Sequence, residues 1–457
     1  MTKPTADVVI CGAGIGGVSA AYVLAARFGV SNVVLVDDRA PLTLTSDKST
    51  EAYRNWWPGP DDSMVRMMDR SIDLMEELAS NCDNRFMLNR RGYLYATADP
   101  DRANALLTSG TLASAQGAGE LRVHRGQASD PSYQPHHAAD WEGAPDGADL
   151  ILDRTLIHEY FPTLADDVCA VLHTRRSGWF SGQQLGMEQL ERARQAGTTL
   201  MSGRVVGVDV DHQGVSGVRV AGGGVETTIS TRCFVNAAGP MIQPVARLLG
   251  GKLPVFSELH VKMSFRDHMG VVPRDTPLLI WEDPQHLTWS RDEAETLDSS
   301  DETRWLLGQM PPGVHMRPEG SEHVIVLWPY HSEPVSEVYP IEPPPNYGEI
   351  ALRGISRLMP SMTAYLDHLP AIFVDGGYYT KTRENRPLAC PLWCDGAYLH
   401  GALSGFGMMA SLGTAEILAC HIAGTTPPDY APSFDLTRYD DPGYVRSIDD
   451  WGGTGQL

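Results

Sequence analysis

The sequence predicts an α/β protein built from two interleaved parts, a parallel β-sheet covered by helices and a separate antiparallel β-sheet. The first forty residues alternate two short apolar strands with an Ala-rich helix, which is typical of a βαβ unit whose sheet is buried on both faces. Similar apolar strands return near Val205 and Ala237. Strand-like segments separated by Pro-rich loops occupy residues 258–375, which favours an antiparallel sheet inserted into the first part.

Length and composition indicate a folded protein with more than one core. The chain has 457 residues, of which 42% are hydrophobic and 20% charged, enough apolar material for two or three domain-sized units. The net charge of −21 disfavours nucleic acid and anionic lipid surfaces. No apolar run is long enough to span a bilayer, the first residues leave no room for a signal peptide, and the cysteines are odd in number and scattered. We therefore expect a cytoplasmic protein that binds neither nucleic acid nor membranes.

The elements are expected in the following order. The βαβ unit comprises a strand at 8–11, a helix at 18–28 and a strand at 33–36 that ends at Asp37. The later elements of the same sheet domain are a helix at 186–196, a strand at 204–210 and a buried strand and turn at 231–240. The antiparallel part contains strands at 261–266, 278–282 and 323–328. Residues 117–147 lack any period and indicate a surface insertion, and the polar tail from Arg438 is expected to wrap the surface.

The motif Gly12-x-Gly14-x-x-Gly17 connects the first strand to the first helix. Gly12 permits the sharp turn, Gly14 lets a pyrophosphate approach the backbone, and Gly17 lets the helix pack closely on the strand. Asp37 ends the second strand twenty residues after Gly17, where a carboxylate can accept hydrogen bonds from the ribose of an adenine dinucleotide. Asp38 beside it is expected to be solvated. The context of strand, turn, helix and acidic strand end favours dinucleotide binding over an unrelated glycine-rich turn.

The spread of the sheet strands along the chain indicates which dinucleotide is bound. A nicotinamide dehydrogenase normally places its substrate domain after one compact nucleotide fold, whereas here the strands return at Val205, Ala237 and near the C-terminus. A flavin disulfide reductase needs a second dinucleotide turn and a redox cysteine pair, and Cys390 and Cys394 have three residues between them and no companion cluster. The pattern favours a flavoprotein whose chain passes twice through two domains.

With these features the chain resembles the D-amino-acid oxidase / sarcosine oxidase superfamily of FAD enzymes, from Asp7 to Gly424. Besides the dinucleotide turn, the resemblance is carried by segments 46–54, 178–197, 236–239 and 401–409. It implies an FAD-binding Rossmann-like domain of the glutathione-reductase type, interleaved with an antiparallel β-sheet substrate domain. The implied division is an FAD-binding domain at 1–80, 150–255 and 370–430, a substrate domain at 81–149 and 256–369, and a C-terminal tail at 431–457.

The resemblance also implies which residues contact FAD. The turn at residues 401–409, named the C-terminal turn, would offer backbone N–H groups and a helix N-terminus to the flavin pyrimidine. Reduced flavin carries negative charge there. The implied contacts are Gly12, Gly14, Ile15, Gly16, Gly17, Asp37, Asp38, Ser49, Thr50, Val205, Ala238, Gly239, Gly405, Phe406, Gly407 and Met408.

Three departures from the family pattern change the expected chemistry. Relatives with covalent flavin use a His near Ser49 or a Cys before the C-terminal loop, and neither is present, so we expect non-covalent FAD. The arginine that clamps a substrate carboxylate is replaced by Tyr379, and one family lysine falls on Met409. The lysine that helps relatives use oxygen falls near Leu327 in a strand without lysine, and Lys262 is the nearest candidate for its role.

Several charged side chains are expected near the flavin face. Arg54, Lys381 and Arg383 can each bind an anionic substrate. In the alternative interpretation Arg54 pairs with Glu51 or a flavin phosphate, and Arg383 is solvated. The residues predicted to act in catalysis are Arg54, Tyr379 and Lys262.

The inserted sheet is rich in tryptophan and carries His260, His323 and His331. These histidines are expected to be structural. Most of the tryptophans are expected in the core, with one or two lining a pocket for a bulky or cyclic substrate.

The resemblance implies oxidation of the C–N bond of an amine or N-substituted amino acid, by hydride transfer to flavin N5 to give an imine. The expected partners are a small-molecule amine and either oxygen or another electron acceptor, with a monomer or homodimer as the assembly and no metal. Four alternatives stay open: a flavin hydroxylase, a nicotinamide dehydrogenase, a flavin-binding subunit without activity, and an FAD oxidoreductase acting on a bulky, cyclic non-amine.

Overall fold

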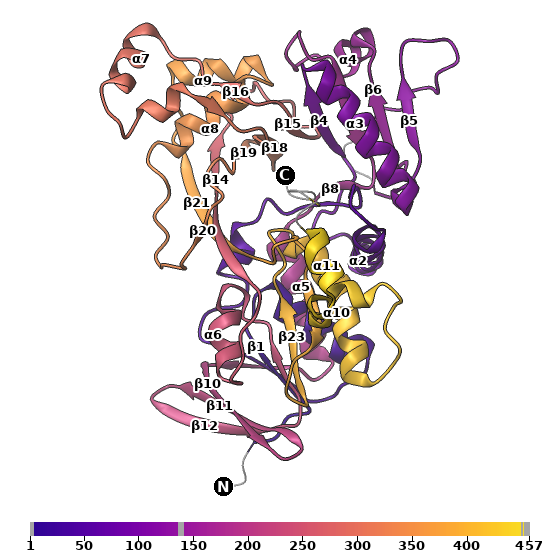
Figure 1. Cartoon of the computed structure of the whole chain (residues 1–457), viewed down its shortest axis with the longest axis vertical. Coiled ribbons are helices and arrows are strands. Elements are labelled where there is room, and N and C mark those ends of the chain that lie inside the picture. Colours follow the sequence, from indigo (N-terminus) through magenta and orange to yellow (C-terminus); the bar gives the residue numbers. More distant parts are fainter. Residues whose placement is uncertain (1–3, 136–140, 449–450, 452–457) are drawn as a thin grey trace.

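A computed structural model of the protein describes residues 4–135, 141–448 and 451. Its first sheet is formed by six strands that are parallel except for the edge strand β22 (Figure 1). In spatial order they are β22 (Leu388–Pro391), β23 (Ala397–Gly401), β13 (Phe234–Asn236), β1 (Val8–Cys11), β2 (Val33–Asp37) and β9 (Thr199–Ser202). Every residue of the central strand β1 is buried, as expected for a parallel sheet covered on both faces.

Helices cover one face of this sheet and a small antiparallel sheet covers the other. The helical layer contains α1 (Ile15–Tyr22), α5 (Gly182–Gln195) and α10 (Gly407–Ala423). The opposite layer is β10 (Arg204–Asp211), β11 (Gly214–Gly222) and β12 (Val225–Ser230), with α6 (Ile242–Arg247) beside it. The strand expected at 204–210 therefore lies in this second sheet and not in the parallel one, because Gly214 (φ +99°) allows a tight hairpin to β11. The parallel edge position is taken by β9.

The expected helix at 18–28 begins earlier than the sequence suggests. It starts at Ile15 and passes at Val23 into a π-helical turn that ends at Arg27. The turn before it therefore delivers the chain directly into the helix N-terminus.

The second part of the molecule is a ten-stranded mixed sheet with mostly antiparallel pairs. Its strands run β20 (Pro334–Val335), β14 (Phe256–Arg266), β19 (His323–Leu327), β18 (His315–Glu319), β15 (Leu278–Trp281), β4 (Tyr93–Thr97), β7 (Ala170–Thr174), β6 (Ala148–Ile151) and β5 (Leu121–His124), with β21 (Phe373–Lys381) paired to β14. This sheet confirms the expected inserted strands and extends further, over residues 148–174.

Two lobes lie above the six-stranded sheet in Figure 1, and the remaining short elements and helices belong partly to these lobes and partly to the body below them. The short strand pairs are β3 (Ala52–Arg54) with β8 (Ser177–Trp179), and β16 (Gln285–His286) with β17 (Gln309–Met310). The remaining α-helices of the described residues are α2 (Ser63–Ser80), α3 (Pro100–Ala113), α4 (Arg154–Tyr160), α7 (Arg291–Asp298), α8 (Tyr347–Ser356), α9 (Ala364–Asp367) and α11 (Pro442–Ser447). None of the described helices is both long and apolar enough to cross a membrane.

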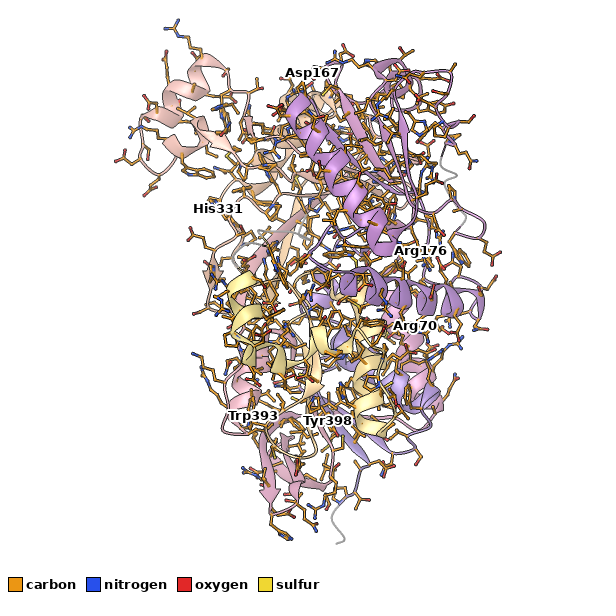
Figure 2. The ribbon with its side chains drawn as sticks, turned by 45° about the vertical axis from the view of Figure 1, so that its right-hand side comes forward. Arg70, Asp167, Arg176, His331, Trp393 and Tyr398 are labelled. Carbon is orange, nitrogen blue, oxygen red and sulfur yellow. The ribbon has the colours of Figure 1, made fainter. Side chains whose placement is uncertain are left out.

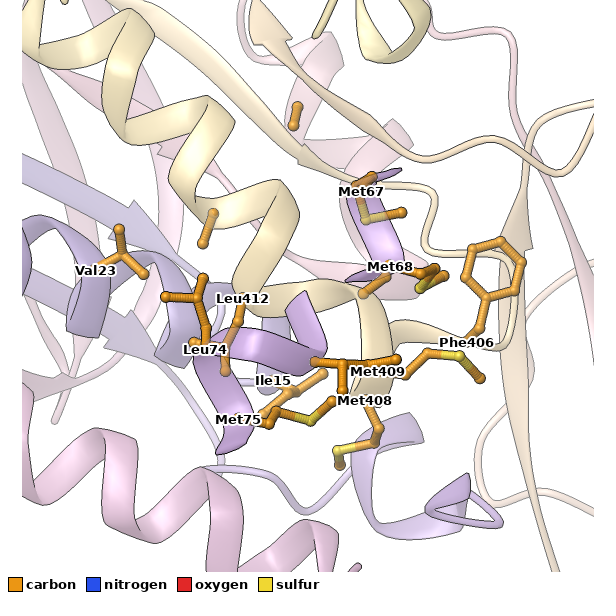
Figure 3. Close-up of a cluster of buried hydrophobic side chains, with 14 of the residues drawn as sticks. Ile15, Val23, Met67, Met68, Leu74, Met75, Phe406, Met408, Met409 and Leu412 are labelled. Carbon is orange, nitrogen blue, oxygen red and sulfur yellow. The ribbon is translucent and has the colours of Figure 1, made fainter. Parts of the chain in front are cut away.

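The largest core joins α1, the first helix of the chain, to α2 and α10. Met408 and Met409 at the start of α10 pack with Ile15 of α1 and Met75 of α2 (Figure 3). Flexible thioether side chains fill such irregular contacts well. Arg70, labelled in Figure 2, adds a bidentate pair to Glu416 between α2 and α10. The C-terminal turn is therefore held against the N-terminal turn by a shared core.

Two segments are more ordered than the sequence suggests. Residues 117–147 contain β5, which pairs with β6, although the segment has no period of its own; residues 136–140 of this insertion lie outside the described part of the chain. The tail from Arg438 does not simply wrap the surface, because Arg438 is buried and pairs with the fully buried Glu384 at 2.7 Å. Ile448, further along the tail, is buried too.

Candidate active site

The glycines of the N-terminal turn have distinct steric roles. Gly12 has φ +105°, and a Cβ placed there would lie 2.5 Å from the carbonyl oxygen of Ala237. A Cβ on Gly17 would lie 1.8 Å from the oxygen of Gly12, so the close packing of helix on strand requires glycine. Gly14 caps α1 with φ −70°, and its Cβ would meet Ser46 Oγ at 3.3 Å. Gly14 also lines the cavities beside the turn.

Two side chains bind the first amides of this turn. The N–H of Ile15 donates to Ser46 Oγ at 2.9 Å, and the N–H of Ala13 donates to Asp37 Oδ2 at 2.6 Å. These donors lie where the helix dipole favours an anion. Asp38 is exposed, as expected, and forms a surface ion pair with Arg204 at 2.6 Å.

Four neighbouring cavities run from this turn to the ten-stranded sheet, and each shares lining residues with the next. The first, of about 430 Å³, is lined by Asp37, Asp38, Val205 and Ala238 among others. The second, of about 130 Å³, passes Gly14 on its way to the C-terminal turn. The two share Gly12, Gly14, Asp37, Leu44 and Ala238. An elongated dinucleotide needs such a continuous series of cavities.

The C-terminal turn approaches the ten-stranded sheet in a strained conformation. Ala402 and Ser404 have φ +51° and +50°, and Gly405 has φ +88°. A Cβ on Gly405 would lie 2.3 Å from the ring of Tyr379, so only glycine fits against that ring. Left-handed backbone at residues other than glycine is costly and concentrates at ligand-binding sites. The strain marks this turn as part of the site.

The third cavity, of about 60 Å³, lies between the C-terminal turn and the sheet. Tyr379 lines it and stacks on His260 with ring centroids 4.0 Å apart. Tyr93 also lines it, and its hydroxyl is buried without a hydrogen-bond partner among the described residues. Burial lowers the pKa of His315, another lining residue, to about 4 and also lowers the pKa of His260. Both histidines are therefore neutral at physiological pH.

The segment at 47–51 is held beside this cavity by two cations of the sheet. Lys262 Nζ donates to the carbonyl oxygen of Ser49 at 2.8 Å, and burial lowers the pKa of Lys262. The buried Arg317 donates to the carbonyl oxygen of Thr50 at 2.8 Å and pairs with Glu51 at 3.3 Å. Glu51 has φ +59°, a second strained position at the site.

The fourth cavity is the largest, at about 720 Å³, and lies against the face of the ten-stranded sheet. It shares Arg54, His260 and Pro329 with the third cavity. Arg54 is only 4% exposed. Its Nε donates to the carbonyl oxygen of Trp56 at 3.2 Å, and its guanidinium lies 4.3 Å from the centroid of the Trp57 ring. A buried cation thus lies where the two cavities meet.

A paired carboxylate lies on the β14 side of the large cavity. Glu258 Oε2 accepts from Lys381 Nζ at 2.9 Å and lies 3.0 Å from His260 Nε2. Although burial opposes ionisation, these two partners hold the pKa of Glu258 below its usual range. Glu258 is therefore an ionised member of a hydrogen-bonded group.

A second carboxylate, Glu282, lines the cavity from the end of β15. Burial raises its pKa to about 7, with a smaller rise from Asp283 and opposing effects of Arg102 and Arg54. No hydrogen bond or ion pair of its side chain is found within residues 4–135, 141–448 and 451. A carboxyl group in this state can gain and lose a proton near neutral pH.

The structure brings together most of the residues that the sequence singles out. Gly12, Gly14, Asp37, Val205 and Ala238 line the first two cavities, and Ser49, Gly405 and Met408 line the next. Arg54 and Tyr379 both line the third cavity, whereas Lys262 does not line it and donates to the carbonyl oxygens of the 47–51 segment. The tail residue Ile448 and Arg383 both line the large cavity.

Sequence reasoning missed Glu258 and Glu282. Glu258 lies on β14 and Glu282 directly follows β15, and both line the large cavity. The sequence shows which side chains alternate along each strand, but it does not show which face of the sheet borders the cavity.

Solved structures of several enzymes share this architecture. L-proline dehydrogenase from P. horikoshii has a TM-score of 0.73 at 17% identity, with 96% of this chain and 99% of that chain covered. Glycine oxidase from Geobacillus kaustophilus has a TM-score of 0.72 at 16% identity, with 95% and 99% covered. Iminodiacetate oxidase from Chelativorans sp. BNC1 has a TM-score of 0.68 at 17% identity, with 94% and 98% covered. At these identities the likeness establishes the fold alone.

A search of curated protein sequences finds no match. A family model for FAD-dependent oxidoreductases, in contrast, matches residues 7–421, nearly the whole chain and both of its interleaved parts. The chain therefore belongs to the DAO family of FAD-dependent oxidoreductases.

Proposed function

We propose that this protein oxidises the C–N bond of an amino acid or N-substituted amino acid at a non-covalently bound FAD. The single observation that carries the proposal is the position of Arg54, a buried cation shared by the third and fourth cavities. A carboxylate held by Arg54 from the large cavity would lie next to the third cavity. A charge-assisted hydrogen bond of this kind both anchors and orients a substrate.

The residues present fit FAD. The first cavity offers Asp37 to a ribose and Val205 to the adenine, and the second offers the turn at Gly14 to the pyrophosphate. Space at Gly239 supports this assignment, because a Cβ there would meet nothing within 4 Å. The third cavity, with the unpartnered hydroxyl of Tyr93 and the start of α10, suits the polar edge of the flavin ring.

FAD, when bound, accepts the hydride that leaves the carbon beside the substrate nitrogen, and water then hydrolyses the imine. The chain's own contribution is orientation and charge. Arg54 holds the carboxylate, the neutral His260 and His315 leave the third cavity without added charge, and Tyr379 closes it against Gly405. The apolar wall of Trp56, Leu106, Leu172 and Ile280 leaves room for a bulky side chain.

The charges around the large cavity favour a substrate that carries both an amine and an acid group. Arg54, Lys381 and Arg383 contribute cations, and Glu258 and Glu282 contribute carboxyl groups. Glu258 is already paired with Lys381, so Arg54 and Arg383 are the cations of the lining that we propose for an anionic substrate group. The titrating Glu282 is the carboxyl group left to face an amine.

Anaerobic reduction of the bound flavin by a panel of compounds tests the proposal. The panel contains primary and secondary amines, N-methyl amino acids and the 2-hydroxy acids of matching skeleton. We expect bleaching by carboxylate-bearing amines and none by the hydroxy acids. Bleaching by hydroxy acids alone would contradict the proposal and favour a non-amine substrate. Flavin that no compound reduces would contradict it as well and favour a flavin-binding subunit without activity.

A further inference from the structure

We propose that Glu282 receives the substrate's amine nitrogen and takes up its proton. This inference rests on the proposed function and deepens it, because it names a proton acceptor and the end of the cavity at which the amine lies. An amine must be neutral before the carbon beside it can lose a hydride readily, and an amino acid reaches the enzyme with a protonated amine. The protein therefore needs a group that removes this proton.

The sheet geometry directs Glu282 into the large cavity. Side chains alternate between the two faces of a strand, so Leu278, Ile280 and Glu282 share one face, and Ile280 lines the cavity with Glu282. On the neighbouring strand β4, Tyr95 lies directly opposite Ile280 and also lines the cavity. Ile280 and Tyr95 thus form a paired apolar and phenolic wall next to Glu282.

Glu282 and Arg54 act on the same small region of this cavity. Tyr95 lies within the field of both, since Arg54 favours and Glu282 opposes ionisation of its hydroxyl, while burial raises the pKa of Tyr95 to about 12. Arg54 likewise stabilises the ionised form of Glu282. A compact zwitterion can therefore place its carboxylate at Arg54 and its ammonium toward Glu282.

The charged and titratable groups around Glu282 leave it near the midpoint of its titration at neutral pH. Burial raises its pKa to about 7, since the ionised form loses hydration. The groups that face it are Arg54, Tyr95, Asp283 and Arg102 directly, and Glu258, His260, Lys381 and Arg383 around the rest of the cavity. Asp283 is committed elsewhere, because its carboxylate accepts from Thr97 Oγ1 and from the N–H of Ala98.

Glu258 is the other cavity carboxyl group, and it cannot serve as the acceptor. Its Oε2 already accepts from Lys381 at 2.9 Å and contacts His260 at 3.0 Å. Its pKa is lowered below the usual range, so its affinity for a substrate proton is weak. Glu258 therefore anchors Lys381, and Glu282 exchanges the proton.

The proposed proton transfer balances without a further reactant. An N–H bond of the substrate ammonium breaks, its electron pair stays on nitrogen, and an O–H bond forms on the Glu282 carboxylate. A neutral amine and a neutral carboxyl group replace the ion pair. Solvent receives the proton from Glu282 after the product leaves.

Calorimetry of the holoenzyme with two probes of similar shape, benzylammonium and benzoate, tests the binding part without turnover. Benzylammonium should bind only to ionised Glu282, so its affinity should fall about tenfold for each pH unit below about 7. Glu282→Gln should weaken its binding at pH 8 by about 10- to 100-fold and remove the pH dependence. Benzoate affinity in Glu282→Gln should not fall. Unchanged benzylammonium binding in this variant would overturn the proposal.

The kinetic part uses a substrate from the anaerobic panel. In the wild type, kcat/KM should decrease as the pH drops below about 7. Glu282→Gln should lose this pH dependence, and its kcat/KM at pH 8 should be about 10²-fold or more below that of the wild type. Glu282→Asp should show the decrease of kcat/KM at low pH again, because it keeps a carboxyl group. A merely structural role of Glu282 would not produce this result. Glu258→Gln, the matched cavity variant, should retain the decrease.

The outcomes separate this inference from the proposed function. If kcat/KM of Glu282→Gln still decreases below about pH 7, the assignment of Glu282 is overturned and the proposal of amine oxidation stands. If no amine reduces the flavin but calorimetry behaves as expected, the proposed function fails and the cation site at Glu282 remains. Normal FAD content and thermal unfolding of Glu282→Asp exclude misfolding as the cause of either result.

Discussion

Lys262 of β14 lies directly opposite Leu327 of β19, and its ammonium donates to the carbonyl oxygen of Ser49 at 2.8 Å. The family resemblance places the missing lysine near Leu327, so Lys262 on the neighbouring strand is the nearest candidate for its role. Its hydrogen bond directs that cation to the segment beside the third cavity. This relationship leads to a prediction about oxygen.

Lys262→Met should slow reoxidation of the reduced enzyme by oxygen, with anaerobic reduction by substrate unchanged. A cation stabilises the superoxide formed when the first electron leaves the flavin, and losing one preorganised charge in such a site costs about 10²–10³ in rate. The wild-type reoxidation rate should decrease as rising pH deprotonates Lys262. Because burial lowers the pKa of Lys262, this decrease should occur at a lower pH than an ordinary lysine would give.

Stopped-flow mixing of reduced enzyme with oxygen measures this rate. The exposed Lys252 supplies the control variant, Lys252→Met, which should behave as the wild type. Fast reoxidation that survives Lys262→Met would refute the role of Lys262. Slow reoxidation in the wild type itself would indicate a dehydrogenase with another acceptor.

Gly14→Val should abolish FAD binding while the chain still folds. The backbone at Gly14 has φ −70°, which valine accepts, but the branched side chain would enter the second cavity where the pyrophosphate is proposed to lie. The flavin-to-protein absorbance ratio measures FAD content, and far-UV circular dichroism reports folding. Gly59→Ala, at an open position, is the control. Full FAD occupancy in folded Gly14→Val would show that the turn is not the binding site.

Acid precipitation should release all of the flavin into the supernatant. The segment Ser49-Thr50-Glu51 and the strand at Tyr378-Tyr379 lack the His or Cys that relatives use for covalent attachment. His260 and His315 do line the third cavity, and each already has a partner, Glu258 and the carbonyl oxygen of Gly313 respectively. Yellow colour that stays with the pellet would disprove non-covalent binding.

Arg54→Met should lower kcat/KM for carboxylate-bearing substrates and leave kcat/KM unchanged for amines that lack a carboxylate. Loss of a hydrogen bond to a charged group costs about 1.5–3 kcal/mol, so kcat/KM for an amino acid should fall about 10- to 100-fold. Arg54→Lys should recover only part, because lysine lacks the planar bidentate donors of arginine. Equal losses for both substrate classes would argue that Arg54 only supports the neighbouring Trp57 ring.

Arg438→Met should destabilise the protein strongly, because it leaves the fully buried Glu384 carboxylate without its cation. Breaking a buried pair from one side costs about 3–5 kcal/mol. The hydroxyls of Tyr439 and Tyr444, which donate to the same oxygen at 2.7 and 3.0 Å, can replace only part of that interaction. Urea unfolding measures the loss. Adding Glu384→Gln should recover stability, and Arg446→Met, at an exposed position of the same tail, should have little effect.

The parts of the site that sequence predicts well are those built from local constraints. Gly12 and Gly17 are required by contacts inside one βαβ unit, so their spacing announces the turn before any tertiary structure is known. The antiparallel strands of the inserted sheet could likewise be located from their composition. In contrast, the strand at Val205 was expected in the parallel sheet and lies in the small antiparallel one, because a hairpin at Gly214 decides its pairing.

The parts that could not be predicted depend on how distant strands align. Glu282 follows the apolar strand β15, and nothing local reveals that it shares a cavity with Arg54, which lies on a strand more than two hundred residues earlier. The pairing of Glu258 with Lys381 depends on the register between β14 and β21. The burial of Arg438 similarly depends on Glu384, in a loop that precedes it by 54 residues.

Product stoichiometry in a single anaerobic turnover tests the account most directly. With a reducing amino acid from the panel and no oxygen present, we predict that reduced flavin, released amine or ammonia, and the corresponding carbonyl acid form in equal amounts. Equal amounts follow if the oxidised bond is the C–N bond and water hydrolyses the imine. Flavin reduction without release of any amine would contradict the account, because oxidation would then have occurred elsewhere in the substrate.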